Sequence, residues 1–313
     1  QVDPIPAVEA VRSSGDDVFS GFAAADSFDG GDGIDLLDFS RETGTQRVVL
    51  NMSNGTARDT YGSLDTINNI EDVYGSAFDD LIVANGVANW IRGQRGADKL
   101  NGKRGADRLE GGDGNDLLLG GTDDDTLIGG AGDDKINGGS GDDALYGDDL
   151  AGTLSGADLL VGQRGGDTLY GGGGEDKLHG GNGADTLYGG DADDLMIGAA
   201  DNDLLYGGSG DDRIKGNNGD DEITGGDGDD TLSGGSGADL FIYNRFESGN
   251  DTITDFTEGE DRLRLFDETE SSVAVAVTID GVEVTTTSHS ILLRGEDETT
   301  VSVNTLSAWI DFA

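Results

Sequence analysis

The chain of 313 residues contains no cysteine, two prolines and two histidines. Without cysteine there is no disulfide, no thiolate metal site and no cysteine nucleophile. His179 and His289 cannot form an HExxH zinc motif, and no GxSxG nucleophile elbow occurs. Two prolines also exclude collagen. The sequence therefore predicts that the protein is not an enzyme.

Basic residues and long apolar runs are equally scarce. The chain has 19 Lys plus Arg against 64 Asp plus Glu, a formal net charge of −45. This charge repels phosphate and excludes a nucleic-acid partner. No run of 18 apolar residues occurs, so no membrane span is expected. No charged segment followed by an apolar stretch opens the chain, so no cleavable secretory signal is visible; residues 1–11 are interpreted as an N-terminal arm.

The abundant residues are glycine, with 56 copies, and aspartate, with 50 of the 64 acids. Both follow a nine-residue repeat from Gly75 to Ile242, which gives 18 units once a six-residue insertion near 149–155 is removed. Position 8 is large and apolar in every unit. Position 6 is Asp in 17 of 18, the exception being Asn89, and position 1 is Gly in 17, the exception being Ala84.

The same frame extends toward the N-terminus. Residues 12–20, 21–29, 30–38 and 66–74 fit it, which brings the total to 22 units. Between them lies an excursion, 39–65, in which Arg47–Met52 is predicted to be a strand. The repeat region is thus expected to span 12–242.

One apolar residue in nine cannot make the stripe of an amphipathic helix. It suits a three-residue strand at positions 7–9 with only the middle side chain inside. The other six residues reverse the chain, and glycines at positions 1, 2 and 4 are expected to supply the positive φ this requires. Two units make a coil of 18 residues, and unit n stacks on unit n+2. The predicted fold class is therefore all-β, a parallel β-roll or β-solenoid.

Stacking would place the position-6 carboxylates in two ladders, one along each edge. Like charges about 5 Å apart repel by roughly 3 kcal/mol at an effective dielectric of 20, so the metal-free chain is predicted to be disordered. Carboxylate and carbonyl oxygens without Cys or His favour Ca²⁺, and flexible glycine turns argue against Mg²⁺. Roughly 16–20 Ca²⁺ ions would offset most of the charge. Folding would then occur outside the cell, where Ca²⁺ is abundant.

The candidate metal ligands are the position-6 aspartates together with two aspartates beyond the last unit, Asp251 and Asp255. The position-6 set is Asp17, Asp26, Asp35, Asp80, Asp98, Asp107, Asp116, Asp125, Asp134, Asp143, Asp158, Asp167, Asp176, Asp185, Asp194, Asp203, Asp212, Asp221, Asp230 and Asp239. Unit 84–92, with Ala84 and Asn89, is predicted to bind no ion. Glu71, Phe78 and Ala25 are expected to weaken neighbouring sites.

The GGxGxDxUx nonapeptides resemble those of the RTX calcium-binding β-roll proteins over residues 12–242. Residues 237–267 resemble the cap that follows the last repeat in RTX proteins, including serralysin-type proteases. The resemblance implies that the position-6 Asp side chains and turn carbonyls hold Ca²⁺. It also implies export by the type I secretion machinery, with an uncleaved C-terminal signal in the last ~60 residues, ending in Trp309-Ile310-Asp311-Phe312-Ala313.

The C-terminal part, 243–313, is predicted to be a β cap. Val273–Ile279 and Val282–Thr287 flank Asp280-Gly281 and are expected to form a hairpin with a type I′ turn. Further strands are predicted at Ser290–Leu293 and Val301–Val303. A polar cap would close the open end of the solenoid.

Tyr146, Tyr170, Tyr188 and Tyr206 occupy position 9 of alternate units, which predicts an outward aromatic ladder on one sheet. One interpretation is stacking of strand-favouring residues. The other is a contact surface for a second copy or a polysaccharide.

The sequence favours a secreted, Ca²⁺-folded structural protein of an extracellular matrix, surface layer or filament that associates with itself. An adhesive or glycan-binding module that uses the tyrosines is the first alternative. The second is the C-terminal secretion and folding part of a larger secreted enzyme.

Overall fold

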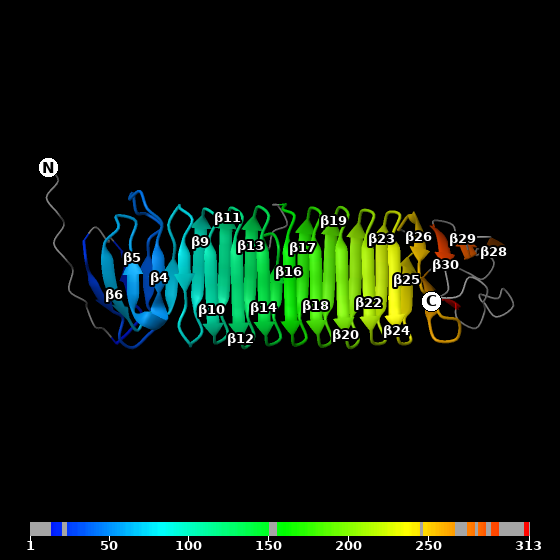
Figure 1. Cartoon of the computed structure of the whole chain (residues 1–313), viewed down its shortest axis with the longest axis horizontal. Coiled ribbons are helices and arrows are strands. Elements are labelled where there is room, and N and C mark those ends of the chain that lie inside the picture. The colour runs from blue at the N-terminus through cyan, green and yellow to red at the C-terminus, as the bar shows by residue number, and fades with distance from the viewer. Residues whose placement is uncertain are drawn as a thin grey trace. The chain divides into compact units, whose positions relative to one another are not determined.

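The computed structural model describes residues 14–20, 24–149, 155–244, 247–266, 274–278, 281–285, 289–293 and 310–312. The chain divides into two compact units, residues 1–156 (unit 1) and 157–313 (unit 2). In each unit the chain winds into stacked coils whose strands form two largely parallel sheets (Figure 1). The predicted arm, the strand predicted at 301–303, the tip of the insertion and the ends of the secretion signal lie outside the described residues.

In unit 1 one sheet consists of parallel strands that carry Tyr74 and Tyr146, and we name it the tyrosine sheet. Its strands, in spatial order, are β1 (Val18–Phe19), β3 (Leu36–Asp38), β7 (Asp72–Tyr74), β9 (Trp90–Arg95), β11 (Arg108–Asp113), β13 (Thr126–Ala131) and β15 (Ala144–Tyr146).

The opposite sheet of unit 1 carries Lys99 and Lys135, and we name it the lysine sheet. Its strands, in spatial order, are β2 (Ser27–Asp29), β6 (Leu64–Asn68), β5 (Thr56–Arg58), β4 (Val49–Asn51), β8 (Leu81–Val83), β10 (Lys99–Arg104), β12 (Leu117–Thr122) and β14 (Lys135–Ser140). A short 3₁₀ helix, η1 (Met52–Asn54), connects β4 to β5. The strand predicted at 47–52 is thus present as β4, and the excursion inserts the antiparallel strand β5 into this sheet.

Unit 2 repeats this arrangement. Its tyrosine sheet contains β17 (Thr168–Gly173), β19 (Thr186–Asp191), β21 (Leu204–Ser209), β23 (Glu222–Asp227), β25 (Leu240–Asn244), β27 (Arg262–Phe266) and β31 (Ile310–Phe312). Its lysine sheet contains β16 (Leu159–Arg164), β18 (Lys177–Asn182), β20 (Leu195–Ala200), β22 (Arg213–Asn218), β24 (Thr231–Ser236), β26 (Gly249–Ile253), β30 (His289–Leu293), β29 (Gly281–Thr285) and β28 (Ala274–Thr278).

The register confirms the predicted 18-residue coil. Leu100 pairs with Leu118, and Leu187 pairs with Leu205, each 18 residues along the chain. Parallel partners are about 4.8 Å apart, so every coil adds one layer. The predicted hairpin is also present, since β28 and β29 are antiparallel and β29 continues to β30. None of the described residues forms a helix long and apolar enough to cross a membrane.

The core consists of the position-8 side chains, which are almost entirely removed from solvent. Ile91, Leu118, Leu187 and Phe241 are 0 % exposed. Burial of one such side chain contributes about 1.5–3 kcal/mol. A coil therefore gains two buried apolar side chains and must obtain the rest of its stability from the backbone ladder and the turns.

Two details of the prediction were wrong. Most strands of the repeat run for six residues, because the ladder continues from positions 7–9 into positions 1–3 of the next unit, as in β10. Position-1 glycines do not have positive φ, whereas the turn residues at positions 2 and 4 do, including Gly112 and Gly114. Gln94 and Ala192 hold the same left-handed conformation without being glycine.

The position-1 glycine is required for close approach. A Cβ on Gly111 would overlap Oδ2 of Asp116 and lie 2.6 Å from the carbonyl oxygen of Gly129 in the next coil. Real Cβ atoms essentially never come that close. Position 1 therefore places the position-6 carboxylate and a backbone carbonyl around one small space.

Candidate metal centre

The position-6 aspartates form the predicted ladders. In unit 2 the N–H of Asp194 donates to Oδ1 of Asp212 at 2.8 Å, and the N–H of Asp212 donates to Oδ1 of Asp230 at 2.8 Å. At the other edge the N–H of Asp203 donates to Oδ1 of Asp221 at 2.8 Å. Unit 1 has the same bonds, for example from the N–H of Asp98 to Oδ1 of Asp116 at 2.7 Å. Each carboxylate therefore binds the amide of the coil before it.

The second oxygen of these carboxylates is buried without a hydrogen-bond partner. This holds for Oδ2 of Asp98, Asp107, Asp116, Asp125, Asp185, Asp194, Asp203, Asp212, Asp221, Asp230 and Asp239. A buried charged oxygen with no partner costs more than a neutral one. The repetition of this orphan oxygen, coil after coil, indicates a ligand that the polypeptide itself does not supply.

Burial raises the pKa of these carboxyls, and hydrogen bonds from the backbone only partly oppose it. The pKa rises from 3.8 to about 8 for Asp98, Asp194 and Asp230, to about 7 for Asp125 and to about 6 for Asp212. Neighbouring carboxylates add to the rise; for Asp194 these are Asp176 and Asp212. A metal-free coil near neutral pH must therefore hold protons or bury negative charge.

The donor set fits a hard cation. Beside Gly111 the unpartnered Oδ2 of Asp116 and the carbonyl oxygen of Gly129 lie around the space that a Cβ would fill, and the same arrangement recurs beside Gly189, with Asp194 and Gly207. Among the described residues no three acidic or histidine side chains gather in one place. Each site thus offers one carboxylate together with backbone carbonyls, which are oxygen ligands of the kind Ca²⁺ takes.

Most of the other predicted ligands lie in or beside these ladders. Asp26, Asp35, Asp80, Asp134, Asp143, Asp158, Asp167 and Asp176 are buried, and Asp17 is half-buried. Asp80 differs, because Oδ2 accepts from the N–H of Ser76 at 2.6 Å and Oδ1 accepts from the N–H of Val48 at 2.7 Å. Its carboxylate is therefore already occupied by hydrogen bonds.

Beyond the last repeat, Asp251 continues one ladder, because Oδ1 accepts from the N–H of Asp230 at 2.9 Å. Asp255 lies elsewhere. Its carboxylate accepts from Oγ of Ser233 at 2.6 Å and from the N–H groups of Gly234 and Gly235 at 3.1 and 3.0 Å. The structure does not bring Asp255 into the ladder.

Two ladder members were missed in the sequence. Oδ1 of Asp65 accepts from the N–H of Asp26 at 2.8 Å, and Oδ1 of Asp261 accepts from the N–H of Asp239 at 3.1 Å. Both are followed two residues later by a buried apolar residue, Ile67 or Leu263. An Asp-x-apolar triplet without the glycines was the signal that could have found them.

A second, exposed row of side chains at position 5 was also missed. Oδ1 of Asp193 accepts from the N–H of Asp211 at 2.8 Å, and Oδ1 of Asp211 accepts from the N–H of Asp229 at 2.9 Å. The bonds of this row run in the opposite direction to those of the buried ladder. Position 5 is occupied by Ala, Gly, Asn or Glu in other units, so its pattern is weaker in the sequence.

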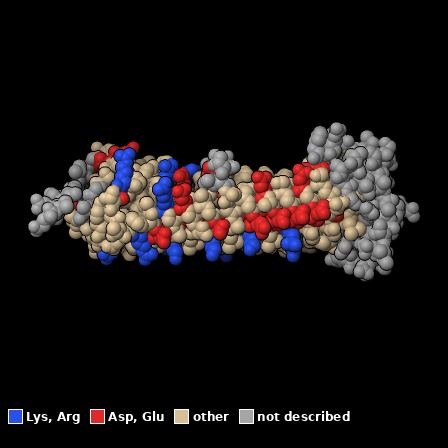
Figure 2. Space-filling view, turned by 90° about the horizontal axis from the view of Figure 1, so that it is seen from above, with Lys and Arg blue, Asp and Glu red and all other residues tan. Residues whose placement is uncertain are grey.

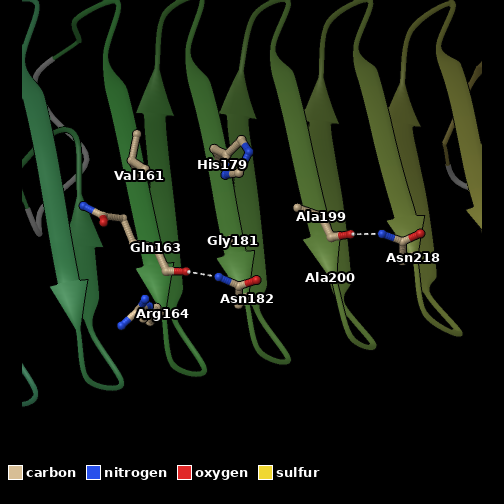
Figure 3. A pocket seen from close by; sticks show the side chains of 9 residues that line it. All are labelled: Val161, Gln163, Arg164, His179, Gly181, Asn182, Ala199, Ala200 and Asn218. Carbon is tan, nitrogen blue, oxygen red and sulfur yellow. Dashed lines mark hydrogen bonds between the residues drawn. The ribbon is translucent and has the colours of Figure 1, made fainter.

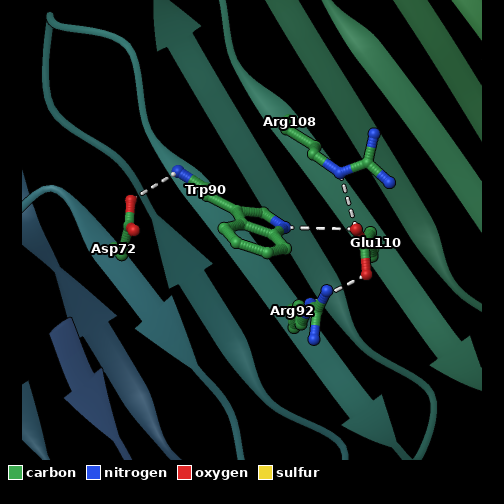
Figure 4. Close-up of polar contacts among 5 residues, drawn as sticks. All are labelled: Asp72, Trp90, Arg92, Arg108 and Glu110. Carbon is green, nitrogen blue, oxygen red and sulfur yellow. Dashed lines mark hydrogen bonds and ion pairs between the residues drawn. The ribbon is translucent and has the colours of Figure 1, made fainter.

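Unit 84–92 has a different construction. The side-chain amide of Asn89 donates to the carbonyl of Glu71 at 2.7 Å, and its Oδ1 accepts from the N–H of Asn85 at 3.4 Å. The adjacent strand carries Trp90, whose indole N–H donates to Glu110 at 3.1 Å (Figure 4). This unit places no carboxylate at position 6.

The family model described as the RTX calcium-binding nonapeptide repeat matches residues 13–37 and, in overlapping segments, 74–241. These matches cover well over half of the chain, so the protein belongs to the RTX calcium-binding repeat family, and it binds multiple Ca²⁺ ions. No individual curated protein matches the sequence significantly.

Proposed function

We propose that the protein is secreted and folds when Ca²⁺ binds its aspartate ladders, and that it serves as a structural component of an extracellular matrix or surface layer. The observation that carries this proposal is the unpartnered buried Oδ2 of residues such as Asp116, Asp194 and Asp230. A coil with these oxygens is stable only when a cation or a proton neutralises them. Bound Ca²⁺ supplies that neutralising charge between consecutive turns.

The position-6 aspartates together with turn carbonyls would hold the ions. A site filled at 100 times its dissociation constant adds about 2.7 kcal/mol to stability, and extracellular modules typically bind Ca²⁺ at about 10⁻⁴–10⁻³ M. With such affinities the sites stay empty and the chain stays unfolded in a cytosol at micromolar Ca²⁺, whereas the sites fill and the chain folds outside the cell. This switch suits export of an unfolded chain through type I secretion machinery.

The tyrosines favour a structural role over glycan binding. In unit 2 the rings of Tyr170 and Tyr188 stack at 4.8 Å with 5° between their planes, and those of Tyr188 and Tyr206 at 5.0 Å with 9°. Both faces of the Tyr188 ring and one face each of Tyr170 and Tyr206 are thus covered by a neighbouring ring, whereas a sugar that stacks on an aromatic residue needs a free face. The stack therefore supports the sheet.

Calcium titration of the purified full chain tests the proposed function. Circular dichroism is expected to show little β structure in EDTA and a cooperative gain of β structure as Ca²⁺ rises, whereas Mg²⁺ at the same concentration produces a smaller gain. Electron microscopy of the Ca²⁺ form then tests for ordered assemblies. Equal β content with and without chelator would refute Ca²⁺-dependent folding, and a dispersed monomer at high protein concentration would refute the structural role.

A further inference from the structure

The lysine sheet of unit 2 presents an outward face that differs from the rest of this acidic chain. Its outward residues on β16, β18, β20 and β22, which we name the lysine face, contain no acid. They are Leu159, Val161, Lys177, His179, Leu195, Ile197, Arg213 and Lys215. Lys177, Arg213 and Lys215 are exposed, and the three ion pairs found among the described residues, Arg92–Glu110, Arg95–Asp113 and Arg108–Glu110, include none of them.

A hollow of about 420 Å³ borders the lysine face, and Val161 and His179 belong to both. The small residues Gly181, Ala199 and Ala200 line it together with Arg164 (Figure 3). Asn182 and Asn218 also line it, and their side-chain amides donate to the carbonyls of Gln163 and Ala199 at 3.5 Å. The hollow beside the face is therefore lined by small residues together with cationic and amide donors.

One turn edge of the same unit carries the complementary charge. We name as the acidic ridge the exposed residues Glu175, Asp191, Asp193, Asp211, Asp227 and Asp229. Figure 2 shows such acidic side chains gathered in rows, with basic side chains along the lower margin of the view. Because Oδ1 of Asp193, Asp211 and Asp229 already accepts a backbone N–H, these carboxylates are held in place with their second oxygen open to a partner.

We propose that the lysine face of one copy binds the acidic ridge of a second copy. The acids of the ridge recur in every coil, about 4.8 Å apart, whereas the basic residues of the face lie on β18 and β22, two coils apart. A second copy aligned with the coils therefore places ridge carboxylates beside both basic strands. The two surfaces are different, so the contact is heterologous and leaves a free ridge and a free face for further copies.

Calcium makes this contact favourable. The metal-free chain carries −45, and copies with that charge repel one another. Ca²⁺ in the buried ladders removes most of this repulsion and leaves the ridge acids exposed and charged. This contact rests on the proposed Ca²⁺-dependent structural function and specifies how the copies associate.

The experiment compares three forms of the full chain in Ca²⁺ by analytical ultracentrifugation at low and high NaCl. The wild type is expected to associate at low salt and to dissociate at high salt. Charge reversal on the face, Lys177→Glu with Arg213→Glu and Lys215→Glu, removes the proposed ion pairs and is expected to weaken association about 10-fold or more. The matched control, Arg41→Glu with Arg47→Glu and Arg58→Glu, carries the same change in net charge and should associate like the wild type.

Complementation makes the test specific. The variant Asp193→Lys with Asp211→Lys and Asp229→Lys reverses three of the six ridge charges and brings their sum to zero, so it should fail to associate alone. A mixture with the face-reversed variant should associate again, since opposite charges now meet in both directions. The gain of β structure on Ca²⁺ addition, measured for each variant, separates a lost contact from a lost fold.

Three results would overturn the contact. The first is association of the face-reversed variant at wild-type strength, which leaves the proposed function intact. The second is equal weakening by the control, which would assign the effect to net charge. The third is a wild type that stays monomeric in Ca²⁺ while an acidic polysaccharide retards it in affinity electrophoresis, which would assign the face to a polysaccharide.

Discussion

The coil around Asn89 and the coils of residues 157–244 share one backbone path but are held together by different chemistry. In the regular coils a buried carboxylate binds one amide and leaves Oδ2 for a cation, as Asp212 does. At Asn89 a neutral side-chain amide binds the carbonyl of the preceding coil directly. The same backbone path thus accommodates a neutral side chain whose amide is hydrogen-bonded and a carboxylate whose second oxygen has no partner.

The coil around Asn89 has further support on its outer surface. The guanidinium of Arg92 lies 4.2 Å from the centre of the Trp90 ring and 5.1 Å from that of Tyr74. Glu110 pairs with Arg92 at 2.9 Å and with Arg108 at 2.6 Å (Figure 4). Arginine over an aromatic ring and a shared carboxylate contribute about 0.5–1 kcal/mol each at such exposed positions. We expect these contacts to support a coil that has no carboxylate at position 6.

The largest expected effect is that of pH on the metal-free chain. The pKa of Asp98, Asp194 and Asp230 rises to about 8 in the fold from an ordinary value of 3.8. Because the folded state holds the protons more tightly, stability is greatest below pH 4 and is lost as the pH rises toward 8. Circular dichroism of dilute protein in EDTA from pH 4 to 8 is expected to show this loss.

In saturating Ca²⁺ the effect of pH on stability is reversed, because protons compete with the ion for the same carboxylates. The Ca²⁺ form should lose its fold as the pH falls. A metal-free chain that gains structure with rising pH would contradict the assignment of the buried aspartates as the source of the instability.

Asp212→Asn is expected to have opposite effects in the two metal states. In Ca²⁺ it should lower the free energy of unfolding by about 3 kcal/mol for each site lost and reduce the number of bound ions. In EDTA at neutral pH it should favour folding slightly, because it removes a buried charge. Isothermal calorimetry and denaturant unfolding measure both effects. Asp211→Asn, at an exposed neighbouring residue, is the control, and an equal change there would contradict the ladder assignment.

Gly111→Ala tests the close approach at position 1. The new methyl would overlap Oδ2 of Asp116, so the free energy of unfolding in Ca²⁺ should fall by about 1–3 kcal/mol. Gly86→Ala is the matched control, because nothing lies within 4 Å of its Cβ position. Thermal unfolding of both variants measures the difference. Equal behaviour of the two would show that the space beside Gly111 is not needed.

The smallest expected effect comes from giving the coil around Asn89 the position-6 aspartate and the position-1 glycine of the other coils. Asn89→Asp alone should destabilise the Ca²⁺ form by about 1–2 kcal/mol, because it buries a carboxylate without the donor bond to Glu71. Its orphan oxygen would also meet the methyl of Ala84, which stands at position 1. With Ala84→Gly added, the variant should gain one Ca²⁺ site, as counted by calorimetry. No added ion in the double variant would contradict the role given to position 1.

Much of this architecture follows from the sequence because each nonapeptide repeats the same local rule. The 18-residue coil, the buried position-8 core and the two aspartate ladders all follow from that rule. The nonapeptide rule did not predict that Asp65 and Asp261 join the ladders, because their Asp-x-apolar triplets lack the glycines of the repeat. It also did not predict strand β5, because the pairing of the excursion depends on contacts between residues far apart along the chain.

The other errors arise from sterics that a repeat pattern does not display. The repeated glycines do not reveal whether a position needs glycine for a positive φ or for lack of space for a Cβ. At Gly111 the nearby Asp116 carboxylate shows that the reason is lack of space. The strands are six residues long, not three, because residues with positive φ such as Gln94 still pair with the neighbouring parallel strand. The repeat pattern does not show that pairing continues through such residues.

The buried ladder has a direction, since every carboxylate accepts the amide of the coil that precedes it in the chain. The two ends of a buried ladder therefore differ in chemistry. The first carboxylate of the ladder has an Oδ1 with no coil before it to donate an N–H, and the last aspartate has an N–H with no carboxylate after it to accept.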